Sequence, residues 1–303
     1  SVMTPEAGQA ASEFAHSIWA SKVRFIGAGC IGTAAVWTLI TLIKPVIDGV
    51  KMSIAALRDN KTAEARALHH TDIDLDPKTT GIIFLVILVG LFIAFYSFVN
   101  GFNLPLSITL TYVVALLMGF FVAAACGYMA GLIGTSASPI SGIGILGIIV
   151  SSLVVLGLSK TFEVFDMPGG AMFSTAFAIF ITSVIVSIAA ISNDNLQDLK
   201  TGQLVGATPW KQQVALIIGS VVGAFAIAPV LNLLYQAYGF TGALPRPGMD
   251  PTQALGAPQA TLMTTIAEGI FSSTLDWNYI IFGIFVGIAA IITDRLLKHF
   301  SHG

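Results

Sequence analysis

The chain contains few charged side chains and few cysteines. Charged residues make up 10% of its 303 residues, whereas a soluble domain carries about 25%. The net charge of −2 provides no basic surface for nucleic acid, so no nucleic-acid partner is expected. Two cysteines are too few for a disulfide framework or a metal cluster, and we predict no metal and no cofactor. This composition excludes an ordinary water-soluble domain.

Catalytic sequence motifs are also missing. The chain has no nucleophile–base pair, phosphate-binding loop or HExxH site, so we predict that it is not an enzyme. His69 and His70, followed by Asp72, Asp74 and Asp76, could bind a metal weakly. Adjacent histidines point in different directions, however, and a solvated loop is the favoured interpretation.

Long apolar segments account for most of the sequence, which is 55% hydrophobic. A membrane-spanning helix needs about 20 apolar residues, and this criterion predicts an all-α, polytopic transmembrane protein with about seven spans. The predicted spans cover residues 23–47, 81–98, 108–130, 140–158, 172–191, 214–235 and 279–297. Residues 261–275 are apolar but short and contain Glu268, so we predict a re-entrant or half-buried helix there.

The positions of lysine and arginine predict the orientation. If residues 49–80 form a cytoplasmic loop, ten of these side chains lie at the inner ends of the spans and four at the outer ends. This asymmetry agrees with the positive-inside rule, and an eighth span at 261–275 would weaken it to eight against six. Residues 237–260, rich in glycine and proline, are then an extracytoplasmic loop.

The amino end is predicted to lie outside the membrane, after a short surface helix over residues 4–20. Residue 1 is serine rather than methionine, and no secretory signal precedes the first span. We therefore expect residues 1–303 to be a single transmembrane domain that forms part of a larger protein.

The most informative segment lies between residues 116 and 158, which contain no charged side chain. Small and polar residues interrupt the apolar pattern at its centre, and Pro139 is suited to the start of the next helix. Irregular backbone within a membrane requires protein or water around it. We predict that two helix ends meet here at mid-depth and line a substrate pathway, formed by Tyr128, Gly131, Gly134, Thr135, Ser136, Ser138, Pro139, Ser141 and Gly142. A tight turn packed by small residues is the alternative.

Two other groups of residues are candidates for function. Glu268 is an isolated carboxylate in an apolar stretch, which is typical of a proton or ion path, although it could also extend from an interfacial helix to water. Thr264, Thr265, Ser272 and Ser273 could hydrogen-bond it. The polar segment 192–202 contains Asp194, Asp198 and Lys200; a structural loop is the favoured interpretation, and a gate or substrate exit is the alternative.

Three strings of residues resemble the oligopeptide transporter family, and more closely its bacterial and yellow-stripe-like branch. They are residues 21–29 (SKVRFIGAG), residues 131–136 (GLIGTS) with 139–142 (PISG), and residues 198–202 (DLKTG) with 206–210 (GATPW). The resemblance implies a proton-coupled secondary transporter of small peptides or metal–chelate complexes. Family members are longer and have more helices, so the resemblance implies an internal or C-terminal-half segment.

We therefore predict part of a secondary active transporter in a bacterial cytoplasmic membrane. Its expected partners are a small peptide or metal–chelate substrate, protons, lipid, and either the remainder of the same transporter or further copies in a homo-oligomer. Glu268 is the predicted proton carrier. A passive channel for small polar solutes and an intramembrane enzyme acting on lipid are the alternatives.

Overall fold

The computed structural model describes residues 11–59, 69–99, 105–134, 138–240, 248–250 and 253–301. Nearly all of them are helical, and an isolated β-bridge between Phe240 and Leu255 is their only extended pairing. The helices are α1 (Ala11–Ile18), α2 (Arg24–Asp59), α3 (Pro77–Val99), α4 (Pro105–Ile133), α5 (Ile140–Thr161), α6 (Gly170–Val205), α7 (Pro209–Ala237), α8 (Pro258–Phe271) and α9 (Trp277–Ser301). A π-helical turn, Trp19–Val23, joins α1 to α2.

Seven of these helices are long and apolar enough to cross a membrane, which confirms the predicted fold class. They are α2 to α7 and α9, each containing one predicted span. The predicted short helix is α8, with 14 residues. A helix is present over part of the predicted segment 4–20 as α1, and it continues through the π-helical turn into α2; residues 4–10 lie outside the described residues.

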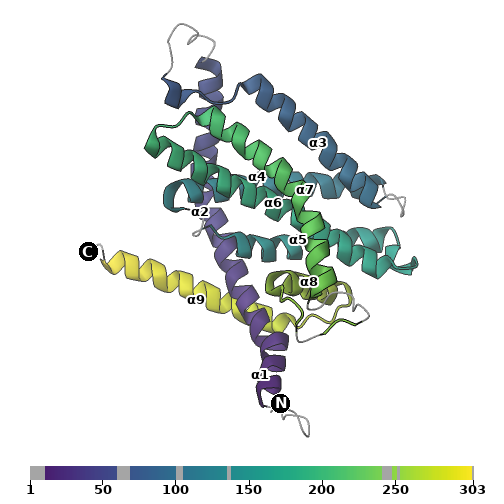
Figure 1. Cartoon of the computed structure of the whole chain (residues 1–303). Coiled ribbons are helices and arrows are strands. Elements are labelled where there is room, and N and C mark those ends of the chain that lie inside the picture. Colours follow the sequence, from purple (N-terminus) through teal and green to yellow (C-terminus); the bar gives the residue numbers. More distant parts are fainter. Residues whose placement is uncertain are drawn as a thin grey trace.

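The centre of the bundle consists of α4, α5 and α6. Both α4 and α5 pack against α6 (Figure 1). Gly119 of α4 lies against Ile188 and Gly127 against Leu196, so α4 and α6 run in the same direction. Gly147 of α5 faces Thr182 and Gly144 faces Val186, so α5 is antiparallel to α6. These directions agree with alternating crossings of one membrane.

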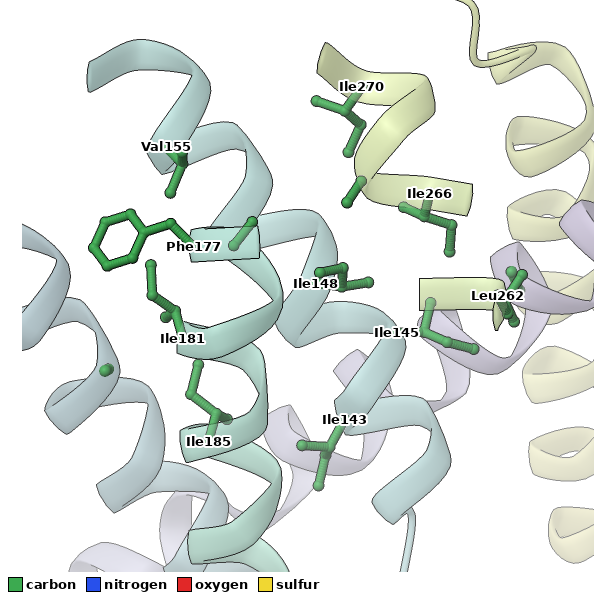
Figure 2. Close-up of a cluster of buried hydrophobic side chains, with 14 of the residues drawn as sticks. Ile143, Ile145, Ile148, Val155, Phe177, Ile181, Ile185, Leu262, Ile266 and Ile270 are labelled. Atoms are coloured by element: carbon green, nitrogen blue, oxygen red, sulfur yellow. The ribbon is translucent and has the colours of Figure 1, made fainter. Parts of the chain in front are cut away.

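The apolar core draws on most of the helices, and Figure 2 shows the part of it where α5, α6 and α8 meet. Figure 2 shows Ile148 of α5 between Ile181 of α6 and Ile266 of α8, and all three side chains are buried. Polar pairs are also enclosed, because the Ser159 and Ser174 hydroxyls lie 2.9 Å apart and both residues are buried. The short helix α8 is thus an integral part of the packed centre.

The helices α2 and α9 form a second close contact. A Cβ atom on Gly283 would lie 2.1 Å from the Ile26 carbonyl oxygen, and one on Gly29 would lie 2.2 Å from the Ile280 carbonyl oxygen. Only glycine allows backbones this close, as in other membrane helix pairs. Further along the contact, Gly287 lies against Thr33 and Arg295 lies over the Trp37 ring, so α2 and α9 run in the same direction. A full eighth crossing at α8 would have made them antiparallel.

Two predicted loop boundaries were wrong. The loop at residues 49–80 begins later, because α2 continues to Asp59. The polar segment 192–202 is not a loop, because α6 continues through it to Val205. Leu196, Leu199 and Gly202 extend the packed face of α6, and Gly206, with φ of 72°, ends the helix in the left-handed conformation. Asp194, Asp198 and Lys200 are therefore helical residues.

Candidate functional site

The predicted break between α4 and α5 is present. Its first described residue is Gly134, with φ of 97°, whose N–H still bonds the Ala130 carbonyl. Pro139 then precedes the first residue of α5, Ile140. Thr135 and Ser136 lie outside the described residues. With 29 and 22 residues, α4 and α5 are each long enough to cross a hydrocarbon core of about 30 Å, so their lengths do not by themselves place the break at mid-depth.

A buried asparagine holds the break against α6. The Ser138 hydroxyl donates to the Asn193 side-chain carbonyl and also lies 3.3 Å from the Cys126 carbonyl oxygen. Asn193 is 2% exposed. One residue earlier, the Ser192 hydroxyl donates to the Ala123 carbonyl of α4 over 2.7 Å. These polar contacts join the residue before Pro139 and the carboxyl-terminal half of α4 to the same turn of α6. Sequence reasoning did not single out Asn193.

The start of α8 lies beside the start of α5. The Gln259 side-chain amide donates to the Ser141 carbonyl over 3.2 Å, and Gly144 faces Met263 one turn further along. The two helices therefore run in parallel from a common level. On the other side, the Arg24 guanidinium of α2 donates to the Pro258 carbonyl. Arg24 and Gln259 were not predicted site residues, and only this contact between distant segments identifies them.

The remaining predicted pathway residues differ in exposure. Gly142 is buried against Ala35 and Ile31 of α2, where a Cβ would lie 2.8 Å from the Ala35 Cβ. Tyr128 and Ser141 are exposed, and Gly131 is half-buried with no neighbour within 4 Å of a Cβ. The structure thus brings Ser138, Pro139, Ser141 and Gly142 together at the start of α5.

Glu268 is exposed on the side of α8 that faces α6. It lies in an open cleft with Ala171, Met172 and Thr175. The hydroxyls expected to bond its carboxylate bond backbone carbonyls instead: Thr264 to Ala260 and Thr265 to Thr261. The Ser272 hydroxyl reaches the Glu268 backbone carbonyl over 2.6 Å, and helical geometry explains this, since that carbonyl is one turn earlier.

The polar end of α6 forms a different surface. Asp198 lines a cleft between α6 and α7 together with Thr201, Gln212 and Ser220, while Lys200 points elsewhere and donates to Gln203 over 2.9 Å. Residues before α3 cover the adjoining turn: the Trp210 N–H bonds the Ile73 carbonyl, and Gln213 contacts Asp74 and Leu75. His70 lies 3.2 Å from the Gly206 carbonyl, and no group of three potential metal ligands occurs among the described residues.

Seven long apolar helices, a short helix packed among them and buried polar contacts at a helix break define a polytopic membrane protein. A family model described as OPT oligopeptide transporter protein matches residues 4–302. The chain belongs to this family. Membership of a transporter family, rather than an enzyme family, agrees with the prediction that the chain is not an enzyme.

A Haemophilus influenzae protein, provisionally named an oligopeptide transporter, is 50% identical over 293 residues. The match covers 95% of this chain and 46% of that protein, so the chain spans about half the length of its curated relative. No solved structure matches. The apolar helices and the bacterial relative together support an integral protein of the inner membrane.

Proposed function

We propose that this chain forms part of a secondary active transporter that moves small peptides across the bacterial inner membrane. The substrate pathway passes the start of α5, where Ser138, Pro139, Ser141 and Gly142 lie. The family and the name of the Haemophilus influenzae relative support transport of peptides. The remaining walls of the pathway come from the rest of the same transporter or from a second copy.

One observation carries this proposal. Arg24 is at the predicted outer end of α2, whereas Ser141 is at the predicted inner end of α5. Within two adjacent residues of α8, the Pro258 carbonyl accepts from Arg24 and the Gln259 amide donates to Ser141. Helix ends assigned to opposite membrane faces therefore meet at one point. This meeting supports a break that lies within the membrane, where irregular backbone must be enclosed by protein or wetted by water.

The chemistry of this point suits a carboxylate. The first amides of a helix have no partner within it, and its amino end carries a partial positive charge. Here the amino ends of α5 and α8 lie side by side and parallel. Such ends bind anionic substrate groups in transporters with broken helices. A peptide's terminal carboxylate fits this arrangement, and the neutral Ser138 and Asn193 add polar contacts without a competing charge.

Uptake by cells that make the full-length protein tests the pathway. We expect Ser141→Leu to lower the uptake of labelled di- to pentapeptides at least tenfold, because it places an isobutyl group at the exposed start of α5. Ser97→Leu, at an exposed site near the end of α3, is the matched control and should leave uptake unchanged. Wild-type uptake by the Ser141→Leu variant would count against the proposal.

Substrate protection provides a second measurement. In a protein whose Cys30 and Cys126 are replaced by serine, Ser141→Cys should react with a membrane-impermeant thiol reagent. Saturating peptide should slow that reaction, whereas a cysteine at Ser97 should show no protection. If saturating peptide does not slow the reaction at residue 141, this residue does not line the pathway.

Proton coupling is assigned to Glu268 in this proposal. An ionisable side chain within a mostly apolar cleft of a membrane protein commonly marks an ion path. Glu268→Gln should abolish peptide accumulation driven by an acid-outside gradient while leaving peptide exchange without a gradient intact. Glu163→Gln, an exposed acid between α5 and α6, is the control. Dissipative flux in the wild-type protein would instead favour a passive channel.

Metal–chelate complexes are the second substrate class, and competition of ferric or nickel chelates against labelled peptide distinguishes the two. The cleft that contains Asp198 is the proposed gate, and Asp194 lies one turn earlier on α6, whereas Lys200 points away from the cleft. Neutralising Asp198 with asparagine should change the maximal rate of uptake more than the peptide concentration at half-maximal rate.

A further inference from the structure

The contact between α2 and α9 opens into an apolar groove. Close packing ends near Gly287, where a Cβ would lie 2.9 Å from the Thr33 Cβ. Beyond it the two helices diverge towards their carboxyl ends, as the purple and yellow ribbons show (Figure 1). The groove between them has a volume of about 380 Å³. It is lined mainly by aliphatic side chains, among them Val36, Ile40, Ile288, Ile292 and Leu296.

Arg295 lies at the end of this groove and has no ion-pair partner among the residues that the structure describes. The Arg295 guanidinium carbon is 5.2 Å from the centroid of the Trp37 ring. The neighbouring Asp294 bonds Lys298 over 2.7 Å, and no carboxylate of the described residues forms a salt bridge with Arg295. Lys44 follows on α2, exposed and likewise without an ion pair within the described part of the chain. This end of the groove therefore carries excess positive charge.

The spacing along α9 places this cation at a membrane surface. Trp277 is the first residue of α9, and Arg295 follows a stretch, residues 278–293, that contains no charged side chain. Eighteen residues of helix separate them, which is about 27 Å and close to the thickness of the hydrocarbon core, about 30 Å. Tryptophan and arginine are both typical of the interface. On α9, the Arg295 end of the groove thus lies at the predicted cytoplasmic surface, and the Ile288 end lies within the hydrocarbon layer.

We propose that this groove binds an anionic phospholipid of the inner leaflet. One acyl chain lies between Ile40 and Ile292, and the phosphate bonds the Arg295 guanidinium. Arginine binds phosphate through two parallel N–H groups, and stacking on Trp37 leaves those groups available. The selectivity for a net negative headgroup follows from the charges present: Asp294 is already paired, so the ammonium of a zwitterionic lipid finds no free carboxylate there.

Native mass spectrometry tests this site on the full-length protein released from membranes that contain phosphatidylglycerol and phosphatidylethanolamine. We expect the wild-type protein to retain phosphatidylglycerol in preference to phosphatidylethanolamine. Arg295→Gln should lower that retention about tenfold, and Arg295→Lys should restore part of it. Ile292→Trp, which fills the groove and keeps the charge, should also lower retention.

Lys211→Gln provides the matched control. Lys211 lies 5.8 Å from the Trp210 ring, so it forms the same type of cation–aromatic pair, but neither residue lines the groove between α2 and α9. Its substitution should leave lipid retention unchanged. Equal retention in Arg295→Gln and wild type, or equal retention of the two lipids, would overturn the proposal. A photoreactive residue at position 292 that crosslinks to protein and not to lipid would also overturn it, because another segment would then occupy the groove.

Discussion

The helices α5 and α7 have similar hydropathy but different surroundings. Half of the most apolar stretch of α5 is buried, whereas none of the corresponding stretch of α7 is. The buried residues of α5 include glycines and serines, whereas Gly219 and Ser220 of α7 are exposed. Gly142, Gly144, Gly147, Ser151 and Ser152 are all buried on α5, and Phe225 on α7 is 79% exposed. Because lipid is as apolar as leucine, hydrophobicity alone cannot tell a protein contact from a lipid contact.

The largest effect should come from a glycine at a backbone contact. Gly283→Leu forces the Ile26 carbonyl away from α9, and we expect it to separate α2 from α9 and abolish recovery of folded protein. The matched change is Gly223→Leu on α7, where a Cβ has no neighbour within 4 Å. Yield of monodisperse protein in detergent measures both. Similar yields would show that the glycine contact does not hold the two helices together.

Truncating a buried isoleucine of α5 should cost more stability than truncating an exposed isoleucine of α7. Ile148→Ala removes a fully buried side chain between α6 and α8, and we expect a loss of about 2–5 kcal/mol in the free energy of unfolding. Ile218→Ala, at a position 59% exposed on α7, should cost less than about 0.5 kcal/mol. Thermal unfolding in detergent measures both. A large cost at Ile218 would mean that α7 is packed against protein on its exposed side.

The polar contact at the helix break should have an intermediate effect. Asn193→Ala removes the acceptor of Ser138, and we expect a loss of about 1–3 kcal/mol in stability. A double-mutant cycle with Ser138→Ala isolates the pair, with an expected coupling of about 0.5–3 kcal/mol. Asn195→Ala on the same helix is the control. Additive losses from Ser138 and Asn193 would contradict the contact.

The smallest effect concerns the end of α6. Gly206 has φ of 72°, a conformation that costs an alanine about 1 kcal/mol. Gly206→Ala should therefore destabilise the protein slightly, and Gly206→Asn should do so less because asparagine tolerates this region. Circular dichroism during heating compares the two. If the Gly206→Ala variant is as stable as the wild-type protein, α6 does not end at this residue.

The sequence predicted helices and crossings better than contacts. Apolar length was enough for the seven spans, and loop charge correctly separated α8 from them. The end of α6 was predicted wrongly because Asp194, Asn195 and Asp198 are typical of a loop. The helical spacing of Leu196 and Leu199 was the better indicator, since it continues the apolar face of the helix. The start of α5 was identified from Gly134 and Pro139. Its partners Asn193, Arg24 and Gln259 come from distant segments, and their meeting depends on helix tilt, which composition does not encode.

The contact of Gly29 with α9 also affects how the protein is made. About 250 residues separate Gly29 from Gly283, so at about 5–20 residues per second the ribosome reaches the second partner roughly 12–50 s after the first. During that interval the newly inserted α2 has a bare glycine surface in the bilayer. A chaperone or a neighbouring chain that occupies this surface would compete with assembly, and slow translation of the segment between α2 and α9 would lengthen the exposure.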